Sequence, residues 1–413
     1  MKSSLTERTL TRTTKNARAL RDLSTLACPL QRAVRFAVRS GFLLLALAAP
    51  ACNALSPTAA PTTEATAAPA APPIPSDTPA QLSTATLPPG QTAGYLTFVV
   101  NVHDWTHPTE SADILLQLIG LFEKYGVRGD FYFTAEITRQ LAETRPDVIE
   151  RFKNSNMTLS YHVRPPHPLY TGFDDRLKGL DDATLYQTLL DYETYALDLT
   201  TGDLDRSRPG GYTYVAQVFG RKPAVAPTPS GDPRLKDAAQ RVYAGLGAQM
   251  TLLYHEESTK VDQPFEYVNG LLVRPSDFSV TSIDGSDNFW WNFMSKPDAA
   301  QYNPTVMLQT QLAEWESHAY GRPPFVTALI HENNFYRGGP EGWTSIYYTV
   351  ENGKRGDPLS PPFDLSAPDP SRPRTEADKA AIRAAYEELV AYAAAHLSVV
   401  TSEDIVALAP AEP

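Results

Sequence analysis

The sequence predicts an α/β fold, built on a parallel sheet or a (β/α) barrel, over residues 91–413. Residues 95–102 (YLTFVVNV) are almost continuously apolar and rich in β-branched side chains, as expected of a strand that is buried on both faces. Strand patterns then alternate with helical patterns at short intervals along the chain. Such alternation is typical of βαβ units, which build parallel sheets and barrels.

The first helix is predicted to begin near Pro108 and to stop at Gly126, with apolar residues at helical spacing between them. A second helix is expected over 136–153 and a last one over about 376–396. The Pro- and Gly-rich stretch 338–373 is predicted to be a long loop. The remaining strands are expected at 129–134, 157–161, 222–227, 249–254, 270–274, 325–330 and 399–401.

Composition and charge exclude several classes of protein. Of the 413 residues, 42% are hydrophobic and 20% are charged, so the chain is not wholly disordered. Two cysteines exclude a disulfide-rich scaffold and an all-cysteine zinc site. The net charge is −11, although residues 1–52 carry nine Lys or Arg against two acidic residues. The rest of the chain is therefore strongly acidic and repels phosphate backbones, so a nucleic-acid partner is not expected.

Residues 1–52 are predicted to be an export signal. Three arginines precede a short apolar run over 42–51, which is too short to cross a bilayer as a stable helix. Cleavage could follow the Ala-Pro-Ala motif at 49–51, or Cys52 could be lipidated as in a bacterial lipobox. The lipoprotein interpretation is favoured because residues 53–90 form a Pro/Ala/Thr-rich, disordered linker of the kind that tethers a domain. We therefore expect an exported protein, either a cell-surface lipoprotein attached to the membrane only through its N-terminal lipid or a secreted one.

Histidines gather where predicted strands end, which is where parallel α/β folds place their chemistry. Imidazole and carboxylate suit Zn²⁺ or another divalent first-row ion. His255 alone is interpreted as a hydrogen-bonding group, and His107, beside a proline, as a helix-entry residue. His162 and His167 differ because the prolines between them hold the two imidazoles at a fixed separation. The positions concerned are His103-Asp104, His162, His167, His255-Glu256 and His331-Glu332.

Five short motifs follow one another along the chain. They are FVVNVHD (98–104), GVRGDFYFT (126–134), LSYH followed by a second histidine (159–167), ALIH (328–331) and SVVTSED (398–404). Together they resemble the polysaccharide deacetylase family, the carbohydrate esterase-like proteins with a NodB-homology domain. The resemblance is strongest over about 95–170. It implies a distorted (β/α) barrel of the glycoside hydrolase/deacetylase type and a divalent metal, most often Zn²⁺.

The resemblance also implies a role for each matching residue. Asp104 matches the metal-binding aspartate, His162 and His167 match the pair of metal-binding histidines, and His331 matches the histidine that protonates the leaving group. His103 stands where the family has an aspartate that acts as general base, so we expect His103 to take that role. The two ligand histidines are five residues apart instead of the family's four. The family's Arg-x-Pro motif, which orients the base, is not evident.

These expectations lead to a metal-dependent hydrolase that removes N- or O-acyl groups from a cell-surface or extracellular carbohydrate. A metal-bound water would attack the acyl carbonyl. Trp290, Trp291 and Tyr336 are candidates for stacking on sugar rings, although the tryptophan pair would equally suit core packing. One alternative is a catalytically degenerate, membrane-tethered carbohydrate-binding protein on the same barrel. Another is a metal hydrolase that acts on a phosphoester, a peptide or a different amide.

Overall fold

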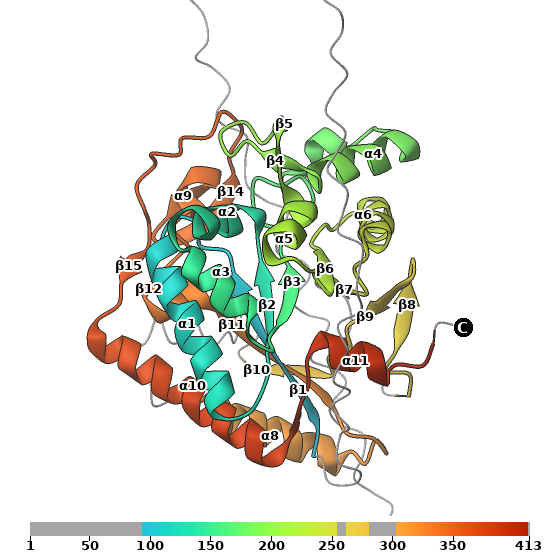
Figure 1. Cartoon of the computed structure of the whole chain (residues 1–413), viewed down its shortest axis with the longest axis vertical. Coiled ribbons are helices and arrows are strands. Elements are labelled where there is room, and N and C mark those ends of the chain that lie inside the picture. Colours follow the sequence, from blue (N-terminus) through green and yellow to red (C-terminus); the bar gives the residue numbers. More distant parts are fainter. Residues whose placement is uncertain (1–92, 254–261, 281–302, 412–413) are drawn as a thin grey trace, which may run out of the picture. The chain divides into compact units, whose positions relative to one another are not determined.

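The structure is a computed structural model that describes residues 93–253, 262–280 and 303–411 (Figure 1). The predicted export signal, Cys52 and the 53–90 linker lie outside the described residues. His255-Glu256 and the Trp290-Trp291 pair also lie outside them. Within the described ranges, none of the helices combines the length and the apolar character that crossing a membrane requires.

A parallel sheet forms one side of the fold. Its strands run in the order β10-β11-β1-β2-β3, and β16 pairs with the first two residues of β1. All of these pairings are parallel, and β1 lies in the middle because its apolar run is buried on both faces. The bounds are β1 (Tyr95–Val102), β2 (Asp130–Phe133), β3 (Thr158–Tyr161), β10 (Phe278–Val280), β11 (Phe325–His331) and β16 (Ser398–Val399).

A second sheet continues the first around a ring. Its order is β6-β7-β9-β8, in which only β8 is antiparallel. The Ala224 N–H donates a 2.7 Å hydrogen bond to the Leu159 carbonyl, which joins the start of β6 to β3. No strand pairing links β9 to β10 among the described residues, so the ring is interrupted there. The bounds are β6 (Val225–Thr228), β7 (Met250–Leu253), β8 (Glu266–Val268) and β9 (Leu271–Val273).

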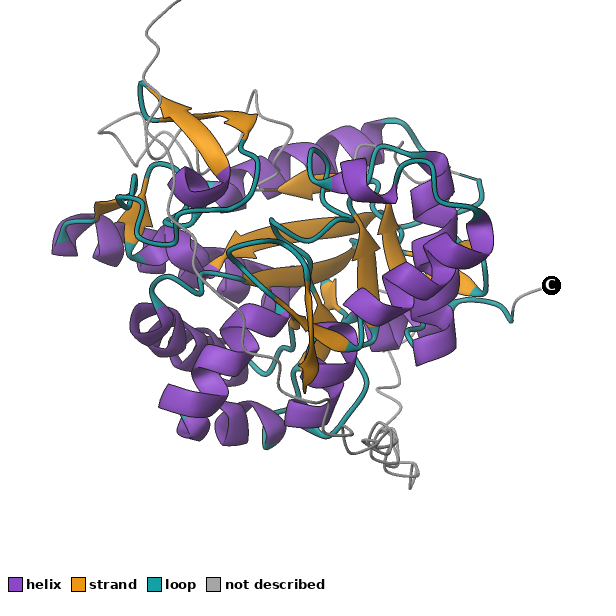
Figure 2. Cartoon of the chain, turned by 90° about the horizontal axis from the view of Figure 1, so that it is seen from above, coloured by secondary structure: helices purple, strands orange, loops and turns teal. Residues whose placement is uncertain are grey.

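One apolar cluster fills the inside of this ring. It combines side chains from both sheets, which pack together although they come from six different strands. Packing across the ring is what a barrel interior requires, so the predicted distorted (β/α) barrel is confirmed. A larger cluster combines side chains of the strands and of the helices. Figure 2 shows these helices around the strands. The strand residues of the inner cluster are Val99, Tyr132, Val225, Met250, Leu272, Phe325 and Leu329.

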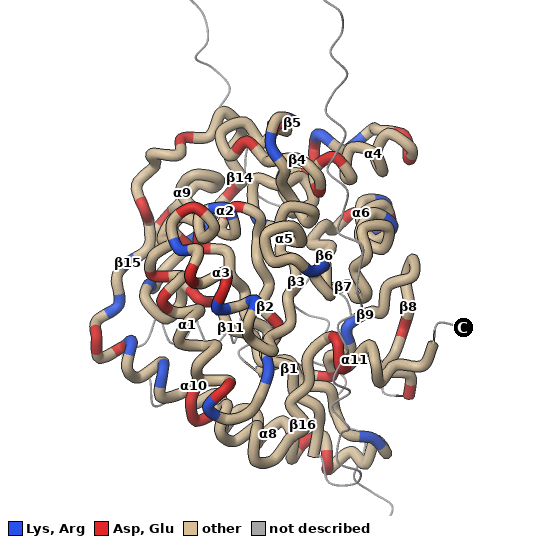
Figure 3. The backbone as a smooth tube through the Cα atoms, in the orientation of Figure 1, with Lys and Arg blue, Asp and Glu red and all other residues tan. Residues whose placement is uncertain are grey.

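Helices surround the strands, and one predicted helix is divided in two. The stretch expected as a single helix over 136–153 forms α2 and α3, because Pro146 cannot donate a main-chain hydrogen bond and disfavours a helical conformation at Arg145. Both β1 and β11 lack Lys, Arg, Asp and Glu, whereas α1, α2, α3, α6 and α10 each carry both signs of charge (Figure 3). The bounds are α1 (Pro108–Lys124), α2 (Ala135–Thr144), α3 (Pro146–Lys153), α4 (Asp182–Tyr192), α5 (Gly211–Phe219), α6 (Pro233–Leu246), α8 (Pro304–Ser317), α10 (Glu376–His396) and α11 (Ser402–Leu408).

The segment predicted as a long loop over 338–373 is structured. A short helix and an antiparallel hairpin occupy it, and their aromatic side chains pack around Trp343 and Phe173 in a third apolar cluster. Further short elements that the sequence did not predict are the β4–β5 hairpin and two 3₁₀ turns. The bounds are η1 (Asp174–Leu177), β4 (Tyr195–Leu197), β5 (Leu204–Pro209), η3 (Glu332–Phe335), β12 (Arg337–Gly338), α9 (Thr344–Tyr347), β13 (Tyr348–Glu351), β14 (Lys354–Pro358) and β15 (Arg372–Pro373).

Candidate functional site

Strand alternation explains which residues enter the candidate site. Successive side chains of a strand point to opposite faces, so residues two apart share a face. Val99 and Leu329 pack inside the barrel. His103 follows Val99 by four residues and His331 follows Leu329 by two, so both histidines lie on the same inner face, at the carboxyl ends of β1 and β11. Along β3, Leu159 and Tyr161 pack outward against helices, which leaves His162 on the inner face. Three predicted site histidines therefore converge.

The rings of His103, His162 and His331 form a buried cluster. The ring centroid of His103 lies 5.7 Å from that of His162 and 5.2 Å from that of His331. His331 is the most exposed of the three, at only 9%. Both ring nitrogens of His162 are buried and have no hydrogen-bond partner among the described residues. A buried polar atom without a partner is costly, so it indicates a place where a ligand or a water binds.

Arg164 fixes the orientation of His103. Its Nε donates a 2.7 Å hydrogen bond to Nδ1 of His103. Because an arginine nitrogen only donates, Nδ1 must accept, and the neutral imidazole carries its proton on Nε2. Burial, and then the positive charge of Arg164, lowers the pKa of His103 well below its usual value. The expected general base is therefore held as a neutral N–H donor in this structure.

Glu332, the residue that follows β11, lies beside the same histidine cluster. Its Oε1 accepts hydrogen bonds from the backbone N–H groups of His103 (2.6 Å) and Asp104 (2.7 Å). Its Oε2 lies 3.5 Å from Nε2 of His103 and accepts no hydrogen bond from the described residues. Burial, together with the nearby charge of Asp104, raises the pKa of Glu332 to about 8. The raised pKa means that Glu332 holds a proton more readily than an exposed glutamate does, so it is suited to act as an acid.

His331 is oriented by the neighbouring strand. The Asn101 side-chain amide lies 3.1 Å from Nε2 of His331, which accepts its hydrogen bond, so the neutral ring carries its proton on Nδ1. Burial, and then Arg164, lowers the pKa of His331 to about 3. Burial lowers the pKa of His162 in the same direction. The cluster is thus a set of neutral imidazoles that can donate or accept one proton each.

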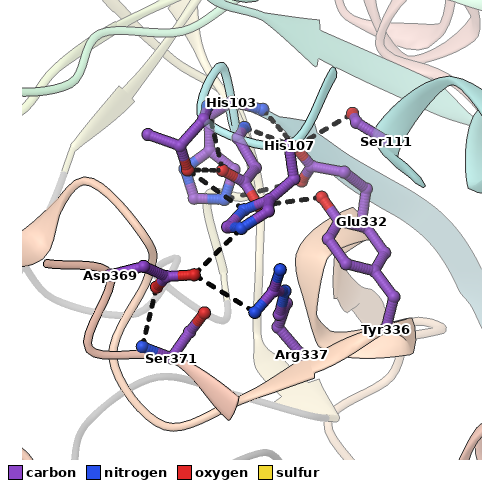
Figure 4. A network of polar contacts seen from close by, with 10 residues as sticks. His103, His107, Ser111, Glu332, Tyr336, Arg337, Asp369 and Ser371 are labelled. Carbon is purple, nitrogen blue, oxygen red and sulfur yellow. Dashed lines mark hydrogen bonds and ion pairs between the residues drawn. The ribbon is translucent and has the colours of Figure 1, made fainter. Parts of the chain in front are cut away.

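Asp104 faces a different set of groups. Its Oδ1 accepts from the backbone and the hydroxyl of Thr106, and its Oδ2 lies 2.9 Å from Nδ1 of His107 and 2.9 Å from the Tyr336 hydroxyl. His107 is the N-cap residue of α1, and its Nε2 lies 3.0 Å from Oδ2 of Asp369 (Figure 4). The hydrogen bond to Asp104 raises the pKa of His107. Asp104 is therefore already surrounded by donors.

His167 is separated from the histidine cluster by its contacts. Its Nδ1 accepts from the Leu169 backbone (3.2 Å), and its Nε2 lies 3.4 Å from Oε1 of Glu193. Glu193 also accepts from the Tyr212 backbone and the Tyr243 hydroxyl. Burial raises the pKa of Glu193 to about 7 and lowers that of His167 to about 3. His167 thus belongs to a buried network beside α4, α5 and α6.

The structure does not assemble the expected metal ligands. Asp104 binds Thr106, His107 and Tyr336, while His167 contacts Glu193. Across the described part of the chain, no group of three or more His, Cys, Asp or Glu residues is placed to hold a metal ion. The donor set taken from the family resemblance therefore does not fit the metal in this arrangement, and we derive no chemistry from it.

The aromatic side chain of Trp343 packs beside the histidine cluster. Trp343, which is fully buried, has its ring 6.4 Å from that of His103 and 6.0 Å from the Arg164 guanidinium. Tyr336, a candidate for stacking on sugars, is instead buried with its hydroxyl on Asp104, so its ring is not an open platform. The predicted stacking pair at 290–291 lies outside the described residues. In this conformation the histidine cluster is closed.

Three residues of this centre, Arg164, His107 and Trp343, have no site role in the sequence-based prediction. Arg164 lies inside the quoted motif, whereas Glu332 is predicted there only as the carboxylate beside His331 in a pair that suits a metal ion. His107 was interpreted as a helix-entry residue, which it is, although its ring also binds Asp104. Trp343 gave no signal because it lies in a predicted loop. The Arg164-Pro165 pair is the one sequence signal for this arginine, which donates a hydrogen bond to His103 in the structure.

The sequence matches no protein-family model and no curated protein. A structure described as a probable polysaccharide deacetylase from Pseudomonas aeruginosa aligns with a TM-score of 0.43 at 13% identity, covering 76% of this chain and 90% of the other. Puue allantoinase aligns with a TM-score of 0.43 at 12% identity, covering 80% and 97%. A family 4 carbohydrate esterase pseudoenzyme from Bacillus anthracis aligns with a TM-score of 0.29 at 10% identity, covering 58% and 55%. The structural neighbours are thus polysaccharide deacetylases and related proteins at low identity, and with TM-scores below 0.5 they carry no argument about activity.

Proposed function

We propose that the chain hydrolyses acyl groups, acetyl groups foremost, on an extracellular or cell-surface carbohydrate. The observation that supports this is the cluster of His103, His162 and His331 beside Glu332, at the carboxyl ends of the barrel strands. Buried imidazole and carboxyl atoms without partners in the described structure are suited to acyl transfer, which needs both a proton acceptor and a proton donor. The carbohydrate substrate is suggested by the sequence motifs alone.

The hydrogen bonds suggest a division of roles. His162 has unpaired ring nitrogens within the described structure, so it is the acceptor for the proton of the attacking water. The Nε2–H of His103 has no hydrogen-bond partner in the described structure, so it can donate to the oxyanion that develops on the acyl carbonyl. Oε2 of Glu332 carries the proton for the leaving oxygen or nitrogen. No step in this scheme passes through a metal ion.

The test is acetate release by the purified chain from acetylated chito-oligosaccharide and acetylated xylan. We expect release, and a loss of about 100-fold or more in rate for His162→Gln and for Glu332→Gln, since each removes a proton-transfer group. The matched controls are His318→Gln, at the exposed end of α8, and Glu387→Gln, on the exposed face of α10, and both should keep the rate. An unchanged rate in His162→Gln would contradict this assignment.

A second candidate is a carbohydrate-binding protein without turnover. One observation favours it: Asp104 is already occupied by protein donors, so the metal ion that the sequence motifs imply for turnover has no free ligand there. Isothermal titration with the same oligosaccharides separates the two candidates. Binding without acetate release would establish the second, and release would exclude it.

We also propose that the protein is exported and lipidated at Cys52. The proposal rests on the arginine-rich start, the apolar run over 42–51 and the linker that follows. Expression of the full chain in a bacterium with radiolabelled palmitate should label the protein, and Cys52→Ser should abolish the label. Release of unlabelled protein into the medium would instead support cleavage by ordinary signal peptidase.

A further inference from the structure

We propose that the His107 side chain serves as the cationic partner of Asp104 in this chain, in place of a metal ion. The inference rests on the contacts of Asp104 and does not depend on the proposed deacylation. It replaces the ligand role that the sequence motifs imply for Asp104.

The Asp104 carboxylate has its acceptor sites filled by protein donors. Oδ1 accepts from the Thr106 backbone at 3.2 Å and the Thr106 hydroxyl at 2.5 Å. Oδ2 accepts from Nδ1 of His107 and from the Tyr336 hydroxyl, each at 2.9 Å. A carboxylate offers about four lone-pair sites, so four donors satisfy it. A metal ion could bind only by displacing several of these groups.

His107 is held as the cation by a second carboxylate. Its Nε2 lies 3.0 Å from Oδ2 of Asp369. The same Oδ2 forms an ion pair with Nη1 of Arg337, 3.1 Å away, and Oδ1 of Asp369 accepts from the Ser371 backbone at 2.8 Å (Figure 4). An ionised carboxylate only accepts hydrogen bonds, so both ring nitrogens of His107 must donate. An imidazole with two N–H donors carries a positive charge. The His107 side chain is only 11% exposed, so this charge is close to Asp104 and weakly screened.

The backbone packs tightly against this arrangement. Gly342 lies so close that a Cβ atom there would be 2.3 Å from the Thr106 hydroxyl oxygen and 2.7 Å from Cε1 of His107. The His107 ring also packs edge-on against Tyr336, with their centroids 6.2 Å apart. The ring is therefore confined on two sides, by residues more than 200 positions away in the sequence. The contacts with Gly342 and Tyr336 therefore leave the His107 ring little room to turn away from Asp104.

The first experiment measures metal binding by the purified chain. After dialysis against chelator and then against Zn²⁺, elemental analysis should find less than about a tenth of an ion per chain, whereas a structural or catalytic zinc site would retain one. Thermal unfolding midpoints in chelator and in excess Zn²⁺ should agree. One Zn²⁺ per chain that is lost in Asp104→Asn would overturn the proposal. Neither readout depends on activity, so this result is independent of the acetate assay.

The second experiment tests the pairing by a double-mutant cycle. Asp104→Asn and His107→Ala should each lower the thermal midpoint by about 5 °C, and the double variant should lower it no further than either single variant, because the two side chains act on each other. His318→Ala, an exposed histidine, is the matched control and should leave the midpoint unchanged. Additive losses in the double variant would contradict the pairing.

A third variant covers the case in which His107→Ala does not fold. Gly342→Ala removes no polar group and should displace the His107 ring through its new methyl group. We expect the ¹⁵N resonances of His107, which in the wild type should both be those of protonated nitrogens, to shift in this variant. If one wild-type ring nitrogen is instead unprotonated at pH 7, His107 is not the cation and the proposal fails.

Discussion

Nε of Arg164 donates a 2.7 Å hydrogen bond to Nδ1 of His103, in a centre where His103 itself is fully buried. The same guanidinium lies over the rings of Trp343 and Tyr170. Its fixed charge contributes to the lowered pKa of each of the three clustered histidines. Arg164 therefore sets the tautomer of His103, and its charge adds to the effect of burial in keeping the three histidines neutral.

Arg164→Met should release the tautomer of His103. In the wild type, ¹⁵N spectra should show Nδ1 of His103 unprotonated and Nε2 protonated, because Arg164 can only donate. The variant keeps an unbranched apolar side chain, shorter than that of arginine, and offers no donor, so the two tautomers should interchange and the ¹⁵N shifts should move towards each other. Arg355→Met is the control, because Arg355 shares the Tyr170 hydroxyl with Arg164 without contacting His103. Identical His103 shifts in the wild type and in Arg164→Met would contradict this role.

The barrel could be predicted because its signals are local. The apolar run of β1 and the alternation of strands and helices are visible in single windows of sequence, and each predicted strand that is described is present within a few residues. The hairpin and short helix within 338–373 were missed because they are held by packing around Trp343 and Phe173, not by their own pattern. Pro146 is a local signal too, and it divides α2 from α3 where the sequence pattern predicts one helix.

The site was only partly predictable. The rule that chemistry gathers at strand ends located His103, His162 and His331 correctly in one place. The direction in which Asp104 points could not be predicted, because it depends on Tyr336, which is 232 positions away in the sequence. The contact of His167 with Glu193, the C-cap residue of α4, could not be predicted for the same reason, because the two lie 26 positions apart in the sequence. Spacing along a chain therefore predicted which residues meet at one end of the barrel, but not which atoms bind each other.

The contribution of Asp130 to the free energy of unfolding should fall as the pH rises from about 4 to about 7. This carboxylate at the start of β2 is fully buried, where it accepts hydrogen bonds from the backbone and hydroxyl of Ser402 in the first turn of α11. Burial raises its pKa to about 7, whereas an unfolded aspartate has a pKa of about 3.9. The folded chain thus binds an extra proton between these values, and deprotonation costs up to about 1.4 kcal/mol of unfolding free energy per pH unit.

Asp130→Asn isolates this contribution. Urea unfolding of the wild type and the variant at several pH values between 4 and 8 should show the largest difference in pH slope below pH 7. Asp175→Asn, an exposed carboxylate in η1 with a side chain that is 88% accessible, is the matched control and should follow the wild type. A constant offset between wild type and Asp130→Asn at every pH would show that Asp130 does not titrate in this range.

Two glycines should respond oppositely to alanine. Gly210 precedes α5, and a Cβ atom there would lie 2.2 Å from the Tyr195 carbonyl oxygen and 2.4 Å from the Ala196 Cα. Backbone atoms cannot move aside cheaply, so Gly210→Ala should lower the free energy of unfolding by about 3 kcal/mol. Gly120, exposed in the interior of α1, has no heavy atom within 4 Å of its would-be Cβ. Gly120→Ala should therefore raise stability by about 0.5–1 kcal/mol in urea unfolding. Equal effects at the two positions would contradict the close approach at Gly210.

Trp343 should be the residue that ties the 338–373 segment to the candidate site. It is fully buried, its ring packs near Tyr347 and Tyr348, and its other neighbours are His103 and Arg164. Trp343→Ala would leave a large cavity between the 338–373 segment and the candidate site. Urea unfolding followed by circular dichroism should therefore show that the free energy of unfolding falls by about 3–5 kcal/mol. Trp343→Phe keeps most of the apolar volume and should lose less. Trp315→Ala, at a half-buried position in α8, is the control and should cost less than Trp343→Ala. If Trp343→Ala loses no more than this control, the segment is not anchored through Trp343, and another part of the chain must close the histidine cluster.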